Sequence, residues 1–139
     1  MDIRPFETQD EAAVIDLWQR CGLTRPWNDP QKDIRRKLAV QPELFLVGVV
    51  DGEVVATVMA GSDGHRAWIN YLGVEPDRRR EGFGRAIMEE AERLLRAAGA
   101  PKINLQVRTG NQAVIEFYRR LGYALDDVVS MGKRLEHDD

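Results

Sequence analysis

The residues between 72 and 85 constrain the fold of this chain more than any other segment. They read Leu72-Gly73-Val74-Glu75-Pro76-Asp77-Arg78-Arg79-Arg80-Glu81-Gly82-Phe83-Gly84-Arg85. An apolar strand pattern ends near a proline, a basic turn follows, and two glycines stand where a helical pattern begins. Glycine lets backbone amides come close to an anion, and a helix N-terminus presents unpaired N–H groups at the positive end of its dipole. This order predicts a pyrophosphate site at a strand-to-helix turn.

Two other phosphate sites and a plain solvated turn are the alternatives for this segment. A dinucleotide fingerprint would need a third glycine or an alanine where Ile87 stands, and a P-loop would need a Gly-Lys-Ser or Gly-Lys-Thr triplet, which the sequence lacks. Isolated glycines and arginines usually do no more than cap a helix and face solvent. The strand, turn, glycines and helix nevertheless occur in the one order that an anion site requires, which favours the pyrophosphate site.

Hydrophobic periodicity and turn residues divide the chain into strands and helices. The expected elements are, in chain order, a strand over 3–6, a helix from about 12 to 21, a second helix ending near 40, strands over 44–50, 54–60 and 67–74, a helix from about 82 to 98, a strand over 103–107, a helix from about 111 to 121, and a hairpin over 123–135. Thr8 and Glu11 offer a capping box for the first helix. We expect residues 136–139 to fray.

The order of these elements predicts the fold class. The helix from about 82 to 98 lies between two strands, so it should be the crossover of a βαβ unit whose strands are parallel. The two-residue turn Asp51-Gly52 should instead join antiparallel strands. We therefore expect a single α/β domain over residues 1–139, with a mixed, mainly antiparallel sheet flanked by about four helices. A length of 139 residues suits one ordinary domain.

Charge and apolar content exclude several classes of protein. The formal net charge is −3, and basic residues are mixed with acidic ones, so we expect no nucleic acid partner. The longest apolar stretch, residues 45–50, is far shorter than the ~20 residues that span a bilayer, so we expect no membrane segment. The start of the chain lacks the apolar core of a signal peptide, and Cys21 is the only cysteine. These features predict a cytoplasmic protein.

Two segments resemble the GNAT superfamily of N-acetyltransferases, and the resemblance covers nearly the whole chain. Arg79, Gly82 and Gly84 match the family's acetyl-CoA signature, which is Arg or Gln, two residues, Gly, one residue, and Gly or Ala. Residues 72–76 look like its splayed fourth strand, and residues 111–123 look like its second motif, which packs beside the cofactor thiol. Residues 23–30, 63–66 and 132–135 are further similar to small bacterial YpeA-type members.

The resemblance implies a cofactor cleft between the fourth and fifth strands, with acetyl-CoA as co-substrate. Backbone groups of the splayed fourth strand would pair with the pantetheine arm. The implied cofactor-binding residues are Leu72, Gly73, Val74, Arg79, Arg80, Gly82, Phe83, Gly84, Arg85 and Asn111. Asn111 is equally explained as a helix N-cap, and some of the arginines could simply face solvent.

Tyr118 matches the family position that serves as general acid to the departing thiolate. A phenol donates a hydrogen bond at neutral pH, so the residue type suits this role. The alternative is a core tyrosine on an amphipathic helix, which would be the better interpretation without the surrounding motif. The resemblance favours catalysis.

The general base is the open point, because many relatives carry a glutamate on the fourth strand and residues 68–72 contain no carboxylate. A water held by Asn70 or Tyr71, or direct binding of the neutral amine, would have to replace it.

Several other residues receive an interpretation from the sequence. Asp126 and Asp127, in the turn of the expected final hairpin, could attract a cationic acceptor together with Trp27 and Asn28, although acidic turns are usually just solvated. Cys21 lies in the first helix and should be away from both motifs. The two histidines, His65 and His137, are isolated, so no metal is expected.

The leading functional hypothesis is transfer of an acetyl group from acetyl-CoA to a primary amine of a small molecule or a protein. The missing carboxylate motivates an alternative, a non-catalytic acyl-CoA-binding sensor module. A third possibility is binding of ATP or NAD at the Gly82 turn. The resemblance leaves a homodimer open, and it names no acceptor.

Overall fold

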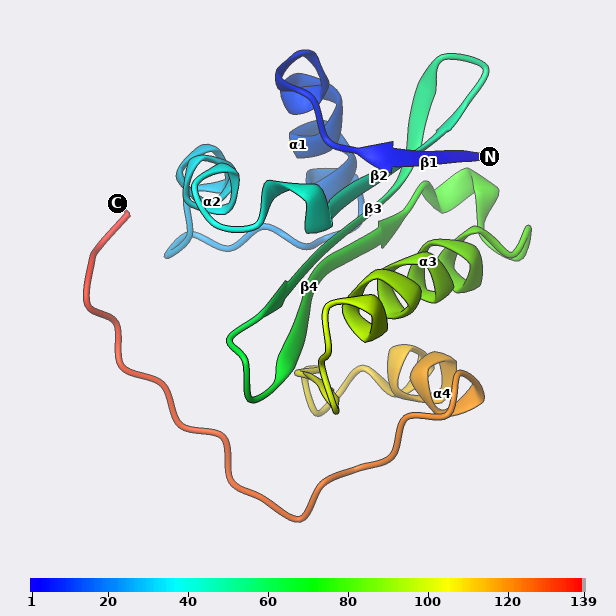
Figure 1. The fold of residues 1–139 in the computed structure, drawn as a ribbon. Coiled ribbons are helices and arrows are strands. Elements are labelled where there is room, and N and C mark those ends of the chain that lie inside the picture. The colour runs from blue at the N-terminus through cyan, green and yellow to red at the C-terminus, as the bar shows by residue number, and fades with distance from the viewer. Residues whose placement is uncertain (139) are drawn as a thin grey trace.

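A computed structural model describes residues 1–138, in which a five-stranded sheet lies between two layers of helices (Figure 1). The strands are β1 (Asp2–Pro5), β2 (Phe45–Val50), β3 (Glu53–Ser62), β4 (Ala67–Val74) and β5 (Ile103–Leu105). The α-helices are α1 (Glu11–Arg20), α2 (Pro30–Leu38), α3 (Phe83–Ala97) and α4 (Gln112–Arg120), and short 3-10 turns cover Thr8–Asp10, Pro42–Leu44 and Pro76–Arg78.

The strands lie in the order β1-β2-β3-β4-β5, with antiparallel pairing throughout except between β4 and β5, which are parallel. The prediction of a mixed, mainly antiparallel sheet with four helices is confirmed. The parallel pair arises because α3 connects β4 to β5 as a crossover, whereas tight turns connect β2, β3 and β4.

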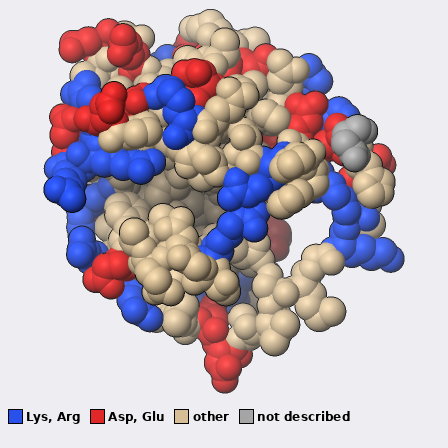
Figure 2. Space-filling view, turned by 180° about the vertical axis from the view of Figure 1, so that it is seen from behind, with Lys and Arg blue, Asp and Glu red and all other residues tan. Residues whose placement is uncertain are grey.

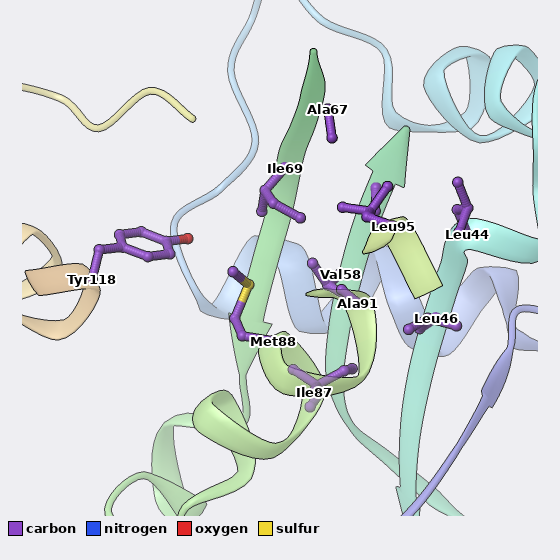
Figure 3. Close-up of a cluster of buried hydrophobic side chains, with 12 residues drawn as sticks. Leu44, Leu46, Val58, Ala67, Ile69, Ile87, Met88, Ala91, Leu95 and Tyr118 are labelled. Carbon is purple, nitrogen blue, oxygen red and sulfur yellow. The ribbon is translucent and has the colours of Figure 1, made fainter. Parts of the chain in front are cut away.

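Side-chain alternation gives the sheet two buried faces. Leu46, Val58 and Ile69 point to the α3 side, where they pack with Ile87 and Leu95 of that helix (Figure 3). The alternate positions point to the opposite side, where Phe45, Val47 and Met59 pack with Trp18 of α1 and Ile34 of α2. The central strands therefore read as continuous apolar runs because both of their faces are covered.

The caps of the helices partly follow the sequence. Asn111 caps α4 as expected, since its side-chain oxygen accepts a hydrogen bond from the Val114 N–H at 3.3 Å. The capping box assigned to Thr8 and Glu11 was wrong. A 3-10 turn precedes α1, and the box consists of Glu7 and Asp10, whose carboxylate accepts from the Glu7 N–H at 2.8 Å and pairs with Arg4 at 2.7 Å.

A bulge in β4 changes which face of the sheet its side chains meet. Thr57 of β3 is opposite Gly73, and Met59 is opposite Asn70, so β4 contains one more residue than β3 over this stretch. Within the extra stretch Tyr71 has a φ of 52°, a left-handed conformation that costs a non-glycine residue on the order of 1–3 kcal/mol. The bulge turns Tyr71 toward α1, where its ring stacks on Trp18 at a centroid distance of 3.9 Å.

A buried hydroxyl fixes this bulge. Thr57 is fully buried, accepts a hydrogen bond from the Trp18 indole N–H at 3.0 Å, and donates one to the Tyr71 carbonyl at 3.0 Å. It therefore joins α1, β3 and the bulge of β4.

Replacing Thr57 with valine is expected to destabilise the fold by about 1–3 kcal/mol, because the shape is kept while a buried indole N–H loses its acceptor. Chemical denaturation measures the change, and Thr57→Ser, which keeps the hydroxyl, should lose less. Equal stability of Thr57→Val and the wild type would contradict the bridging role.

The hairpin predicted over 123–135 was wrong, since residues 123–135 contain no strand. We call residues 123–138 the tail. The tail leaves α4, passes the β5 end of the sheet and returns to α2 (Figure 1). It meets the β5 region through side chains and not through a backbone ladder. Asp126 binds Lys102 and Asn104, and Ser130 binds Gln106. The short β5 leaves little edge on which a hairpin could pair.

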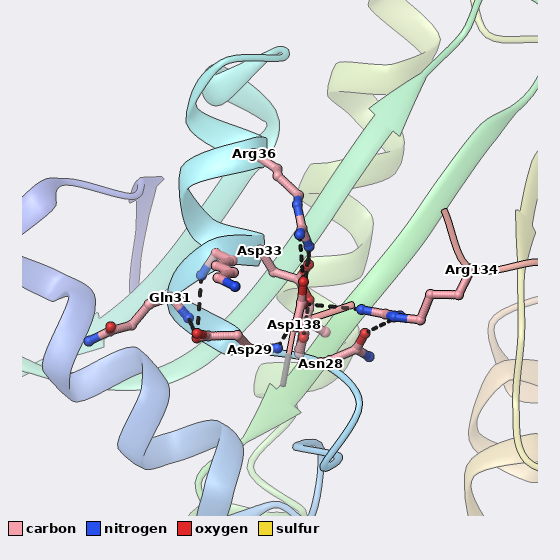
Figure 4. Close-up of polar contacts among 9 residues, drawn as sticks. Asn28, Asp29, Gln31, Asp33, Arg36, Arg134 and Asp138 are labelled. Carbon is pink, nitrogen blue, oxygen red and sulfur yellow. Dashed lines mark hydrogen bonds and ion pairs between the residues drawn. The ribbon is translucent and has the colours of Figure 1, made fainter. Parts of the chain in front are cut away.

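The expectation that residues 136–139 fray was wrong for Asp138, and Asp139 lies outside the described residues. Figure 4 shows Asp138 among the residues around the start of α2. Its carboxylate accepts from the Asp29 N–H at 2.9 Å and pairs with Arg36 at 2.7 Å and with Arg134 at 3.1 Å. These contacts hold the pKa of Asp138 well below its ordinary value, with Arg36 the largest cause. The tail is thus anchored at its far end.

No helix within residues 1–138 combines the length and the apolar content that crossing a bilayer would require.

Candidate functional site

The parallel strands β4 and β5 separate after a short paired stretch. Their ladder joins Ala67–Ile69 to Ile103–Leu105, and β4 then continues to Val74 without β5 beside it. A cleft of about 740 Å³ opens at this point, lined by residues of β4, α2 and α4 and by the segments after α1 and after β5. We call it the main cleft. The splayed fourth and fifth strands expected from the sequence are therefore present.

The turn after β4 leads directly into the N-terminus of α3. Gly82 is the N-cap, with a φ of 82° and no atom within 4 Å of the position where a Cβ would stand. No side chain caps the helix, so the first N–H groups of α3 are open to an anion. The geometry fits the predicted pyrophosphate site. At the end of β4, the turn has no side chain at Gly82, and no side chain caps the start of α3.

The arginines of this turn have different partners. Arg79 donates to the Val74 carbonyl at 3.4 Å, which keeps its side chain on the turn. Arg80 has a φ of 74° and no acidic partner among residues 1–138. Arg85 instead pairs with Glu89 at 3.3 Å on the exposed side of α3. Of the predicted phosphate contacts, Arg79 and Arg80 are thus freer than Arg85 to meet an anion.

The second glycine of the signature has a packing role. A Cβ on Gly84 would stand 3.1 Å from the Phe117 ring of α4 and 3.5 Å from Val74, so the glycine lets the two helices approach. Phe83 lies beside it under the Arg78 guanidinium, 5.3 Å from the ring centroid.

Gly82→Val and Gly84→Val are therefore expected to affect different properties, namely coenzyme A binding and stability. Gly82→Val should weaken coenzyme A binding by calorimetry with most of the fold kept, because its side chain enters open space at the helix start. Gly84→Val should lower the melting temperature, since overpacking costs typically ~1–3 kcal/mol. Gly64→Val is the control for backbone strain, because Gly64 has a φ of 90° and open space in the turn between β3 and β4. Equal coenzyme A affinity in Gly82→Val and Gly64→Val would contradict the assignment of the turn.

Tyr118 of α4 lies on the wall of the main cleft. Its side chain is 8% exposed, and its ring makes edge contacts with Phe117 and Tyr123. The hydroxyl has no hydrogen-bond partner among residues 1–138. Every fully buried side-chain oxygen in that part of the chain has a partner, so the Tyr118 hydroxyl is not fully buried and reaches the surface of the cleft that the residue lines. Figure 3 shows the hydroxyl directed toward β4. Burial raises the pKa of Tyr118 to about 12, which keeps the hydroxyl protonated at neutral pH.

Asn111 and Leu72 also line the main cleft, whereas Gly73 and Val74 continue β4 toward the turn. The Asn111 oxygen is occupied by the cap of α4. Its amide nitrogen has no partner within the described chain.

A hydrogen-bonded pair on the opposite wall was missed by the sequence reasoning. The Tyr71 hydroxyl donates to Asp33 of α2 at 2.6 Å, and Asp33 also pairs with Arg36 at 2.9 Å. Both Tyr71 and Asp33 line the main cleft. Burial, followed by the bond to Asp33, raises the pKa of Tyr71. Only the bulge brings Tyr71 to α2, and no pattern in the sequence predicted that bulge.

The expectation that Cys21 lies away from both motifs was wrong. Its thiol donates to the Val74 carbonyl at 3.3 Å, and its sulfur lies 3.5 Å from the position of a Cβ on Gly73. The residue caps the C-terminus of α1, which packs against the end of β4. Cys21 is therefore a neighbour of the first motif and lines the main cleft.

The acidic pair of the tail and the aromatic loop are in different surroundings. Asp126 is bound to Lys102 at 3.1 Å, which lowers the pKa of its carboxyl. Trp27 is 49% exposed and lies 5.7 Å from the Arg108 guanidinium. No hairpin turn presents Asp126 and Asp127 to an acceptor, because the hairpin is absent. Among residues 1–138, no three His, Cys, Asp or Glu side chains are grouped as a metal site requires.

Comparisons with known proteins agree with this geometry. The model of the Acetyltransferase (GNAT) family matches residues 11–123. A protein named acetyltransferase from Pectobacterium atrosepticum is 52% identical over 138 residues, which cover 99% of this chain and 98% of that protein.

Solved structures share the fold. Ard1 from Thermoplasma volcanium superposes with a TM-score of 0.79 at 30% identity, covering 90% of this chain and 83% of that one. AAC(6')-Iy, solved with the bisubstrate analogue CoA-S-monomethyl-acetylneamine, also reaches a TM-score of 0.79, at 15% identity and with 96% and 97% covered. The second likeness bears on the fold alone.

Proposed function

Because this chain belongs to the GNAT family of acetyltransferases, we propose that it transfers the acetyl group of acetyl-CoA to a primary amine of a small molecule or a protein. The observation that carries the proposal is the continuity of the uncapped start of α3, the splayed β4 and the main cleft. A ligand with a pyrophosphate at one end and a thioester at the other fits such an arrangement.

The residues present fit coenzyme A. The turn from Arg79 to Gly82 and the first N–H groups of α3 would hold its pyrophosphate. The free side of β4 at Leu72, Gly73 and Val74 offers backbone groups to the amides of the pantetheine arm, as an added strand would use them. Asn111 would reach the arm with its amide nitrogen. In this placement the thioester lies in the main cleft.

Tyr118 would serve as the general acid. The amine attacks the thioester carbon, and the carbon–sulfur bond then breaks, with the electron pair going to sulfur. The Tyr118 hydroxyl donates a proton or a hydrogen bond to that sulfur. Its raised pKa of about 12 supports the donor role, because the proton is present at the working pH.

Tyr71 and Asp33 would take up the proton that the amine loses. The Tyr71 oxygen accepts from the amine while its own proton moves along the 2.6 Å bond to Asp33. Asp33 supplies the carboxylate that β4 lacks, from α2. Arg36 keeps this carboxylate oriented.

Release of coenzyme A thiol with a panel of amines, using the full chain, tests the proposal. Amine-dependent release supports an acetyltransferase using acetyl-CoA. Tight coenzyme A binding without release for any amine would favour the sensor module. Preferential binding of ATP or NAD over coenzyme A would overturn the cofactor assignment.

A further inference from the structure

A lysine of α2 lies nearly buried beside the main cleft without any partner. Lys37 is only 9% exposed, yet its ammonium group forms no ion pair and no hydrogen bond with residues 1–138. Every fully buried side-chain nitrogen within residues 1–138 has a hydrogen-bond partner. The Lys37 nitrogen has none, so it is not fully buried and must reach the cleft surface. Burial lowers the pKa of this amine, and the more distant Glu43 opposes that shift. An unpaired cation held in this way is costly unless something compensates it.

The amine tip lies at the junction of two hollows. One is the main cleft, and the other is a side pocket of about 210 Å³; Lys37, Val40, Met59 and Asn70 line both. The side pocket continues over Gly61, whose missing side chain leaves the Lys37 nitrogen 3.3 Å from the position of a Cβ. Trp68, 40% exposed, forms an aromatic wall. The side pocket thus combines an apolar wall with the polar residues Gln41, Ser62 and Asn70 and with one charge of each sign, on Lys37 and Asp63.

The acidic side chains around both hollows are engaged elsewhere. Asp33 binds Tyr71 and Arg36. Asp63, at the rim of the side pocket, accepts two backbone hydrogen bonds from its own turn at 2.8 Å each. The other charged residues that line the main cleft are Arg25, Arg36 and Arg108. Viewed from behind Figure 1, Lys and Arg side chains border a hollow in the surface (Figure 2). The cleft therefore favours an anionic ligand over a polycation.

We propose that the side pocket is a carboxylate subsite, so that the acceptor is an amine carrying a carboxylate, which Lys37 and Asn70 bind. One unpaired ammonium matches the single charge of a carboxylate better than the charge of about −1.5 to −2 on a phosphate monoester. The Asn70 amide has no partner within residues 1–138 and can donate to the second oxygen. This inference rests on the proposed function for the position of the reacting amine.

Helix α2 relates the side pocket to the proposed reaction centre. Lys37 follows Asp33 by one helical turn, a spacing that puts the two Cβ atoms ~5–6 Å apart on one face of the helix. The Tyr71 hydroxyl at the proposed reaction centre lies 2.6 Å from the Asp33 carboxylate, whereas the Lys37 nitrogen extends toward Gly61. The acceptor should therefore carry its amine and its carboxylate at opposite ends of a chain, as an ω-amino acid or an acidic peptide-like amine does.

The test compares ω-amino acids with the matched ω-amino alcohols as acceptors, using 6- and 8-carbon chains. The wild type should favour the amino acids in kcat/KM, and Lys37→Met, which keeps the apolar stem, should reduce this preference by about 10- to 100-fold. Lys32→Met is the matched control, because Lys32 lies on the same helix outside both hollows and its loss should leave the preference unchanged. Melting temperature and coenzyme A affinity show that each variant is folded.

A binding measurement keeps the inference separate from the proposed function. Calorimetry on the protein loaded with coenzyme A compares the 6- and 8-carbon N-acetylated amino acids with the N-acetylated amino alcohols. Tighter binding of the carboxylates by the wild type, lost in Lys37→Met, supports the subsite even if no amine is turned over. Equal or absent binding of carboxylates and alcohols by the wild type overturns it, whatever the acetyltransferase assay gives.

Discussion

Tyr118→Phe is expected to lower kcat by ~10²–10⁴-fold, the typical range of positioned acid catalysis. The substitution keeps the ring and its contacts with Phe117 and Tyr123, and it removes only a hydroxyl that has no hydrogen-bond partner among residues 1–138. Coenzyme A affinity and melting temperature should therefore change little. Steady-state turnover with an acceptor found by screening measures the effect.

Tyr123→Phe is the matched control for this experiment. Tyr123 is a neighbouring tyrosine whose hydroxyl donates to Glu92 at 2.7 Å and which does not line the main cleft. Its replacement removes a hydroxyl without touching the proposed chemistry, so kcat should remain near the wild-type value. If Tyr118→Phe retains kcat within about twofold, far below the range for acid catalysis, Tyr118 is a packing residue.

Asp33→Asn and Tyr71→Phe are each expected to lower kcat/KM by about 10²-fold at neutral pH, because they interrupt the path for the proton of the amine. The loss should shrink as the pH rises toward the pKa of the acceptor amine, since a larger share of the amine is then already neutral. Tyr71→Phe keeps the stacking on Trp18, which limits its structural effect. A pH–rate profile of each variant measures this dependence.

Asp16→Asn controls for the loss of a carboxylate. Asp16 lies on α1, pairs with Arg20 in solvent and does not line the cleft, so its replacement should leave the pH profile unchanged. A loss in Asp33→Asn that stays constant with pH and follows a lower melting temperature would assign Asp33 to structure alone.

The elements that the sequence predicted well are those whose signals are local. The turn Asp51-Gly52, the cap at Asn111 and the N-cap Gly82 of α3 each fix their own backbone through residues within a few positions. The pairing of β4 with β5 followed from the crossover by α3. These features were enough to predict the fold class, whereas the position of the cleft was implied by the resemblance to the GNAT superfamily.

The features that the sequence did not reveal depend on contacts between distant residues. The bulge of β4 is held by Thr57 and Trp18, which lie 14 and 53 residues before Tyr71 in the chain. Asp33 reaches β4 only through that bulge, so the carboxylate missing from residues 68–72 could not be located from the strand itself.

The prediction of a hairpin in the tail was wrong for a different reason. An alternating pattern of apolar and polar residues forms a strand only where the edge of a sheet is available for pairing. Leu125, Val128, Val129, Met131 and Leu135 are all strongly exposed, and none finds a sheet to join.

The anchoring of the tail at Asp138 gives this molecule two units of unequal stability. Residues 124–138 contribute to neither hydrophobic cluster, so releasing them would expose almost none of the core. The contacts of these residues with α2 are mainly ionic, so salt weakens them. They also join residues that are 102 and 109 positions apart in the chain, so forming them costs loop-closure entropy. The tail can therefore detach in a local opening well below the free energy of global unfolding. Since Asn28 and Arg36, which bind the tail, also line the main cleft, ionic strength would set how often these two side chains are released from the tail.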